Sequence, residues 1–180
     1  MNKGIITNHI SYKGIVNIRS IIDKQIVSTS MFNSGTKDLM NLLTKALAGY
    51  DISKQVPKFI NIGYANTQPQ GTYSFILNRN IPLTGIVWGE AVDTQNIPQL
   101  DLDDSASSLM LSCTITSQDK TISSFNGSKL FLLLLSNDGK TVLAKIEDTD
   151  DNVIKDTYNR LTVGTDLIVD WYMIFNSEVK

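Results

Sequence analysis

Apolar and polar residues alternate along most of this chain. A period of two is typical of a β-strand that buries one face, and it is clearest at residues 108–116. The alternating and β-branched runs predict about seven to nine strands. These runs fall at residues 14–27, 59–64, 73–77, 84–92, 108–116, 130–135, 141–146 and 167–175.

Residues 36–48 have a helical period instead. Their apolar positions are spaced i, i+3, i+4, i+7 and i+8, which places them on one face of an α-helix. Thr36 is suited to cap the first turn, and Gly49 can end the helix in a left-handed conformation. We therefore predict one amphipathic helix of about three turns. Its apolar face holds Leu39, Leu42, Leu43, Ala46 and Leu47.

The clearest hairpin lies in the second half of the chain. Residues 130–135 are continuously apolar, as in a strand buried on both faces, and residues 137–139 read Asn-Asp-Gly before the next apolar run. Residues 93–108 are rich in Asp and Ser and predict a long loop. A mostly β chain with one helix favours a two-sheet, jelly-roll-like β-sandwich with the helix covering one end or edge.

The length suits one domain, with two very small domains as the alternative. A chain of 180 residues can bury a core without disulfides or metals. We expect a single β-sandwich domain over residues 13–180 and a flexible N-terminal arm over residues 1–12. The first residues show no secretory apolar stretch, and the longest apolar run is too short to cross a bilayer. We therefore expect a soluble protein made in a cytoplasm.

The overall charge bears on the kind of partner. The net charge is −2 and the isoelectric point is near 5.3, which argues against a nucleic-acid or anionic-membrane partner. Cys113 is the only cysteine, so an intrachain disulfide and an all-cysteine metal site are both excluded. Its place in an alternating run predicts a small core residue.

Candidate catalytic residues are sparse. His9 is the only histidine, so a Ser-His-Asp triad would have to use it. Residues 33–37 contain the letters of a phosphate-binding loop in the wrong order. His9 and Cys113, the two soft ligands, lie too far apart in sequence to indicate zinc. We predict no catalytic residue, no cofactor and no enzymatic activity.

Carboxylates provide the one metal candidate. Asp148, Asp150 and Asn152 match positions one, three and five of a calcium loop. Val153 then stands where glycine is needed, position twelve is Asn159, and the flanks have the pattern of strands. A solvated acidic loop is therefore favoured over a calcium site. The acidic residues at 101–104 and 147–151 also leave a hydrolase open as a third hypothesis.

Aromatic residues leave a sugar-binding surface open. Trp88, Trp171, Tyr172 and Phe175 could form a stacking platform, but the apolar strands around the two tryptophans favour core packing. The residues expected to be exposed are Tyr64, Tyr73 and Tyr158. A carbohydrate- or receptor-binding β-sandwich module is the alternative function.

Two segments of the chain carry recognisable motifs. Residues 33–60 follow a pattern of N-x-G-T, amphipathic helix, A-L-x-G and P-x-x-I. Residues 143–176 follow an ending of L-A-(K/R)-(I/V), I-x-K and L-x-V-x-W-x-(I/M)-x-x-N, except that Ile154 and Lys155 are adjacent. Together these motifs resemble those of small structural proteins of tailed bacteriophages. The shared motifs are structural and identify no site.

The resemblance implies a virion component. Proteins of this kind are head-fibre or capsid decoration proteins, or tail and collar adaptors. We therefore expect a non-enzymatic virion structural protein, synthesised in the cytoplasm of a bacterial host. It would assemble with itself, with a trimer favoured as a closed oligomer, and with capsid or tail proteins.

Overall fold

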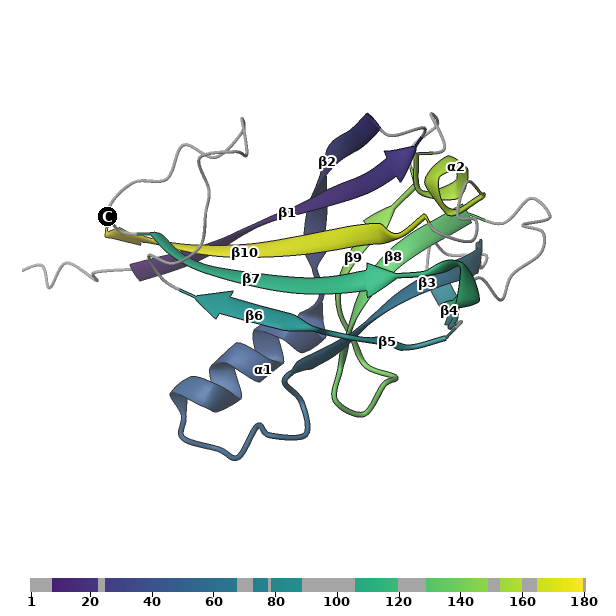
Figure 1. Ribbon diagram of the computed structural model, residues 1–180. Helices are drawn as coiled ribbons and strands as arrows, with labels where there is room; N and C mark the ends of the chain where they lie inside the picture. The colour runs from purple at the N-terminus through teal and green to yellow at the C-terminus, as the bar shows by residue number, and fades with distance from the viewer. Residues whose placement is uncertain are drawn as a thin grey trace, which may run out of the picture.

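The computed structural model of the chain shows a mostly β fold (Figure 1). It describes residues 8–22, 25–67, 73–77, 79–88, 106–119, 129–148, 153–159 and 165–179. The strands are β1 Asn8–Ile22, β2 Gln25–Gly35, β3 Pro57–Thr67, β4 Tyr73–Ile76, β5 Ile81–Pro82, β6 Gly85–Trp88, β7 Ala106–Ile115, β8 Lys129–Ser136, β9 Val142–Glu147 and β10 Leu167–Val179. The helices are α1 Lys37–Leu47, α2 Val153–Asn159 and a 3-10 turn at Ser117–Asp119.

The strands form one antiparallel sheet. Within the described residues its order is β4-β3-β8-β9-β2-β1-β10-β7-β6, with β5 pairing beside β3. In Figure 1, β1, β10, β7 and β6 run across the picture, whereas β9, β8 and β3 rise steeply behind them. The sheet therefore curls around its own core.

β2 joins the two halves of this curled sheet. Its residues 25–33 pair with β1, and only Ser34 and Gly35 pair with β9, opposite Lys145 and Ala144. The two-sheet sandwich expected from the sequence is not confirmed, because this strand belongs to both halves. The mostly β class is confirmed.

One core lies between the halves. It takes Val16, Trp171 and Leu111 from one half and Ile60 and Leu132 from the other. Leu39 and Leu42 of α1, and Ile154 of α2, complete the same cluster. β8 is buried on both faces as predicted, because Phe131, Leu133 and Leu135 form a second cluster on its other side. The free Cys113 is buried in the main core, also as predicted.

The predicted helix is confirmed at residues 37–47. Thr36 is extended and accepts the Leu39 N–H at 3.3 Å, and Gly49 has a φ of +77°. The apolar face is shorter than predicted: Leu39 and Leu42 are buried, but Ala46 and Leu47 are exposed.

Other sequence expectations need correction. The chain has a second helix, α2, where a strand pattern was expected. β1 begins at Asn8, so residues 8–12 of the expected arm belong to a strand paired with β10. Residues 1–7 lie outside the described part of the chain. In the described residues, no helix is long and apolar enough to cross a membrane.

Candidate interaction surface

A groove opens between α1 and the neighbouring ends of β1 and β10. Its volume is about 190 Å³. The lining side chains come from three elements that are distant in sequence. They are Tyr12 of β1, Met40, Leu43, Thr44 and Leu47 of α1, and Phe175 of β10.

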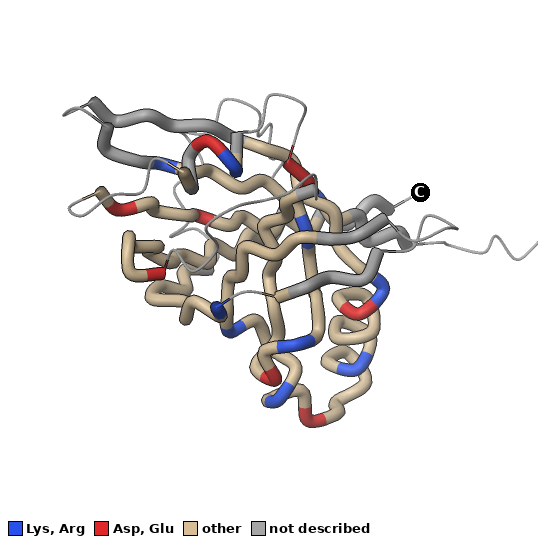
Figure 2. Tube along the Cα trace, turned by 90° about the vertical axis from the view of Figure 1, so that its right-hand side faces the viewer, with Lys and Arg blue, Asp and Glu red and all other residues tan. Residues whose placement is uncertain are grey.

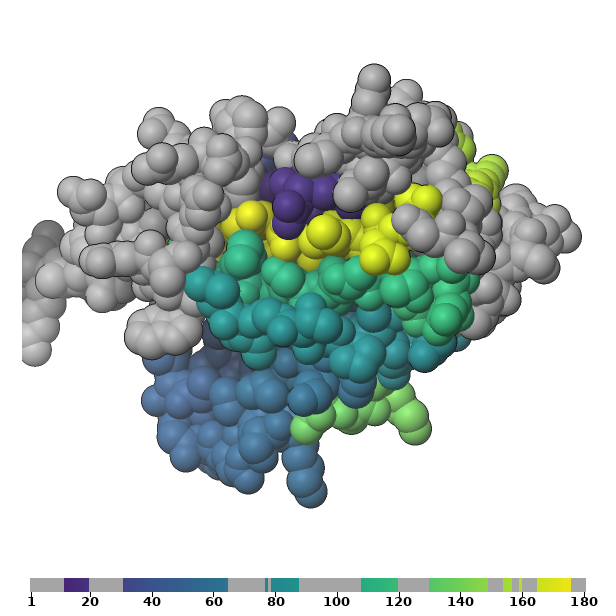
Figure 3. Space-filling model, in the orientation of Figure 1, coloured from purple at the N-terminus to yellow at the C-terminus, as the bar shows by residue number. Residues whose placement is uncertain are grey.

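The walls of the groove are apolar and partly exposed. Leu47 is 80% exposed and Met40 is 42% exposed, although both belong to the helix that packs on the core. Tyr50, just beyond the helix, is 69% exposed. In Figure 3 the blue surface at the lower left of the molecule contains α1 together with the residues that follow it. This helix therefore buries one apolar stripe and presents further apolar residues to solvent.

The floor of the groove is held by an aromatic pair. Tyr12 and Phe175 are cross-strand partners in the β1–β10 ladder, and their ring centroids lie 5.6 Å apart at an interplanar angle of 48°. Such tilted packing is favourable for aromatic rings. The long β1–β10 ladder thus fixes the surface that faces α1.

A partly buried polar network holds the Tyr12 side chain in place. With its amide oriented to match its neighbours, Asn33 accepts the Ile15 N–H and the Trp171 Nε1–H at 3.0 Å each, and donates to the Tyr12 hydroxyl. Burial raises the pKa of Tyr12 to about 12. The phenol is therefore neutral at physiological pH, and its polar atom is engaged away from the groove.

The second hydroxyl group in the described lining of the groove, that of Thr44, also has a hydrogen-bond partner. Thr44 donates its Oγ1–H to the carbonyl oxygen of Met40 at 2.9 Å, within the same helix. The described lining of the groove is thus apolar and contains no charged residue. Its volume is below the range of about 300–1,000 Å³ typical of small-molecule sites. It is the right size for one or two apolar side chains.

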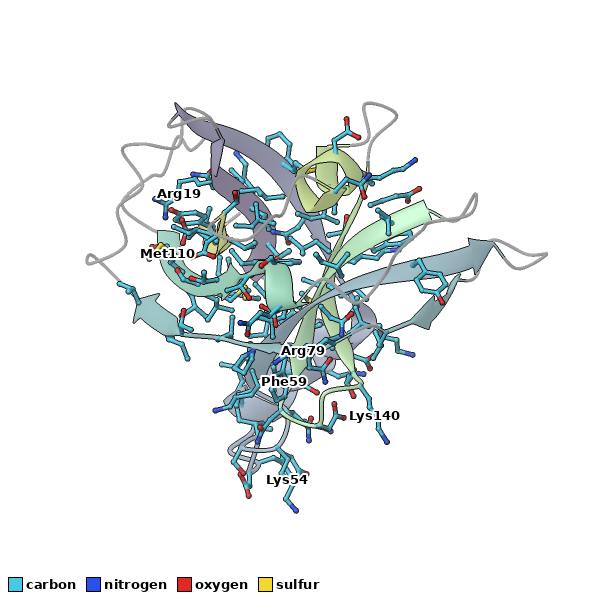
Figure 4. All side chains as sticks on the ribbon, turned by 45° about the vertical axis from the view of Figure 1, so that its right-hand side comes forward. Arg19, Lys54, Phe59, Arg79, Met110 and Lys140 are labelled. Atoms are coloured by element: carbon cyan, nitrogen blue, oxygen red, sulfur yellow. The ribbon has the colours of Figure 1, made fainter. Side chains whose placement is uncertain are left out.

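The outer face of the sheet carries a different polar cluster. Arg19 of β1 donates to Asp170 of β10 at 3.0 Å from Nε, and Ser112 of β7 donates to the same carboxylate at 2.7 Å. Asp170 is almost fully buried, whereas Arg19 is half-exposed. Figure 4 shows Arg19 and Met110 on the same side of the molecule, away from Phe59 and Lys140. The cluster ties three adjacent strands together and has the character of a structural ion pair.

Charges of both signs are dispersed over the described surface. In Figure 2 the blue and red residues alternate along turns and on α1, without a large area of one sign. Among the described residues, no group of three His, Cys, Asp or Glu side chains could hold a metal ion. The described surface is therefore more notable for its apolar groove than for any charged feature.

The calcium candidate is only partly described. Both carboxylate oxygens of Asp148 accept backbone N–H groups of α2, from Ile154 at 2.8 Å and from Lys155 at 3.1 Å. Asp148 therefore caps a helix, and the expectation that a strand follows this loop was wrong. Asp150 and Asn152 lie outside the described residues, as do residues 101–104.

The aromatic candidates are divided between core and surface. Trp171 is fully buried, as the sequence predicted, and donates to Asn33. Tyr64 was expected to be exposed but is half-buried against the main core. The side chains of Trp88, Tyr73, Tyr158 and His9 lie outside the described part of the structure.

The groove was not predicted from the sequence. One sign of an additional apolar surface was present, because Met40 is an apolar residue outside the predicted apolar face of the helix. The contributions of Tyr12 and Phe175 depend on pairing between the two ends of the chain. Comparison with known protein families, curated proteins and solved structures finds no match for this chain.

Proposed function

We propose that this chain is a non-enzymatic structural protein of a bacteriophage virion, which assembles with itself and with capsid or tail proteins. The observation that carries this proposal is the open apolar groove beside α1, together with the exposed Met40 and Leu47 in its lining. Exposed apolar side chains gathered around a concave surface are typical of protein–protein contacts.

The groove supports a protein partner over a small ligand. Its volume of about 190 Å³ fits an inserted side chain. The exposed Leu47 in its lining adds apolar contact area around that insertion. The occupant is a capsid or tail protein that inserts an apolar anchor between Leu47 and Phe175.

The segments that carry the phage resemblance both serve as scaffold. Thr36 caps α1 and also donates its Oγ1–H to the carbonyl oxygen of Val142 at 2.6 Å, which ties the helix to β9. The closing segment forms β10, which pairs with β1 on one side and β7 on the other. A rigid framework that positions a helix and a groove suits a protein that works through assembly.

Quantitative mass spectrometry of purified phage particles tests the proposal. The chain is expected in the particles at a defined copy number, and antibodies against it should label one location in electron micrographs. A chain that is abundant in infected cells but absent from purified particles contradicts the proposal.

Leu47→Glu tests the role of the groove in the same particles. We expect its incorporation to fall about ten-fold or more, because a charge would be buried at the contact. The matched control is Ile86→Glu on β6, where the native side chain is also exposed, at 61%. This control should be incorporated like the wild type, and equal loss in both variants contradicts a specific groove contact.

A further inference from the structure

β2 has a long edge with which none of the described strands pairs. Its residues 25–33 pair with β1 on one side, and no described strand pairs with them on the other side. At about 3.4 Å per residue, this edge is about 30 Å long. The strands at the two ends of the sheet, β4 and β6, have only four residues each. β2 therefore has the longest unpaired edge in the described sheet.

This edge lacks the residues that usually prevent edge pairing. Between Gln25 and Gly35 the sequence contains no Lys, Arg, Asp, Glu or Pro. Natural sheets protect long edges with such residues, because exposed N–H and C=O groups pair readily with another strand. An uncharged edge of this length is therefore suited to a partner strand.

The pattern of residues in β2 favours a second copy as the partner strand. The sequence of residues 25–33 is Gln-Ile-Val-Ser-Thr-Ser-Met-Phe-Asn, which is symmetric in polarity about Thr29. In an antiparallel pair centred there, Ser28 opposes Ser30, Val27 opposes Met31, and Ile26 opposes Phe32. Gln25 opposes Asn33 at the ends. Every apolar residue thus meets an apolar residue, and every polar residue meets a polar one.

We infer that β2 forms a homodimer interface, in which two copies pair antiparallel about a two-fold axis at Thr29. The backbone groups of the edge are self-complementary in this arrangement, and the sheets of the two protomers become continuous. The contact closes at two copies, so it replaces the trimer favoured from the sequence. The inference deepens the proposed self-assembly and rests on it, but uses a surface separate from the groove.

Positions 28 and 30 allow a test by charge. The alternation of a β-strand gives them the same face as position 32, where Phe32 is 58% exposed. Within one protomer they lie opposite Arg19 and Asn17 on β1. In the inferred dimer, position 28 of each protomer lies opposite position 30 of the other, so charges can be placed in repulsive or attractive pairs.

The experiment compares three double variants by sedimentation equilibrium. Ser28→Lys/Ser30→Lys and Ser28→Glu/Ser30→Glu should each weaken the dimer about ten-fold, because two like-charge pairs face each other. An equimolar mixture of the two should form heterodimers of nearly wild-type affinity. The self-complementary variant Ser28→Glu/Ser30→Lys should remain a dimer.

The design separates dissociation from misfolding. Within one protomer, position 28 lies opposite Arg19. A lysine there repels Arg19, whereas a glutamate attracts it, so the two variants should affect the stability of the fold in opposite directions. Loss of the dimer in both variants is therefore not explained by loss of the fold. An unchanged circular dichroism spectrum of the monomeric variants would show that they remain folded. Raised salt should restore the like-charged dimers, because it screens exposed charges.

Two results with the variants would overturn the inference, and a third with the wild type. The first is a dimerisation constant that the like-charged variants leave unchanged, and the second is a mixture that fails to form heterodimers. If the chain is nevertheless found in purified particles, the proposed function stands and only the position of the interface is wrong. A wild-type chain that stays monomeric at every concentration contradicts the interface itself.

Discussion

At the residue scale, the polar network beside the groove depends on Gly14, which leaves room for the amide of Asn33. They are direct partners in the β1–β2 ladder. A Cβ placed on Gly14 would lie 1.9 Å from Asn33 Oδ1 and 2.2 Å from its Cγ. The amide of Asn33 therefore uses the space above Gly14 to reach Trp171 and Tyr12. Glycine is needed here for a close approach.

Gly14→Ala should lower the free energy of unfolding by about 2–3 kcal/mol, because the amide must move and lose buried hydrogen bonds. Urea denaturation measures this change. Gly85→Ala is the matched control in another strand, since its Cβ would meet Ser112 Cβ at an ordinary 3.5 Å. The control should stay within about 0.5 kcal/mol of the wild type. Equal effects in the two variants would show that the close approach has no energetic consequence.

At the element scale, local signals predicted some elements well. The cap at Thr36, the apolar spacing and Gly49 predicted α1 almost to the residue. The apolar run of β8 and the Asn-Asp-Gly turn predicted the β8–β9 hairpin, which is observed. α2 was missed because its seven residues are too few for a clear helical period. Its signal was Asp148, whose side chain caps the helix from six residues away.

The cap of α1 provides a prediction about the helix. Thr36→Val keeps the shape of the side chain but removes the hydroxyl that bonds Leu39 N–H and the Val142 carbonyl oxygen. We expect it to destabilise the protein by about 1–2 kcal/mol in urea denaturation. Thr36→Ser keeps the hydroxyl and should stay within about 0.5 kcal/mol of the wild type. A serine variant as unstable as the valine variant would refute this role of the hydroxyl.

The turn between β8 and β9 gives a pH-dependent prediction. Hydrogen bonds to its carboxylate from Ser136, Thr141 and Lys140 hold the pKa of Asp138 well below its usual range. A lowered folded-state pKa contributes stability above the unfolded value of about 4, and this contribution is lost as the pH falls below it. Acid should therefore weaken the turn.

Asp138→Asn should cost about 1 kcal/mol at pH 7, a modest value because the side chain is exposed to solvent. The cost should become smaller as the pH falls below about 4, where the wild-type carboxylate begins to lose its advantage. Urea denaturation at several pH values measures both. Asp156→Asn, on the exposed side of α2, is the charge-matched control. A difference between Asp138→Asn and wild type that does not vary with pH would contradict the assigned hydrogen bonds.

At the scale of the whole molecule, the closure of the sheet was beyond the reach of local patterns. The halves join where Ser34 and Gly35 meet Lys145 and Ala144, more than a hundred residues away. Each strand pattern is compatible with either one curled sheet or two stacked sheets, because both bury one face of each strand. The groove has the same origin, since Tyr12 and Phe175 lie near opposite ends of the chain.

The curled sheet leaves two separate surfaces for assembly. The apolar groove lies beside α1, and the uncharged edge lies along residues 25–33 of β2. We propose that the groove receives another virion protein and that the edge receives a second copy. The two contacts use different chemistry, because side-chain burial dominates the first and backbone pairing dominates the second.

The mass of the wild-type chain in solution tests self-assembly most directly. Sedimentation equilibrium over a range of protein concentrations measures it without a partner or a label. We predict a reversible equilibrium whose limiting mass is that of two chains, 2 × 20.0 kDa. A mass that remains 20.0 kDa up to the limit of solubility would contradict assembly through β2.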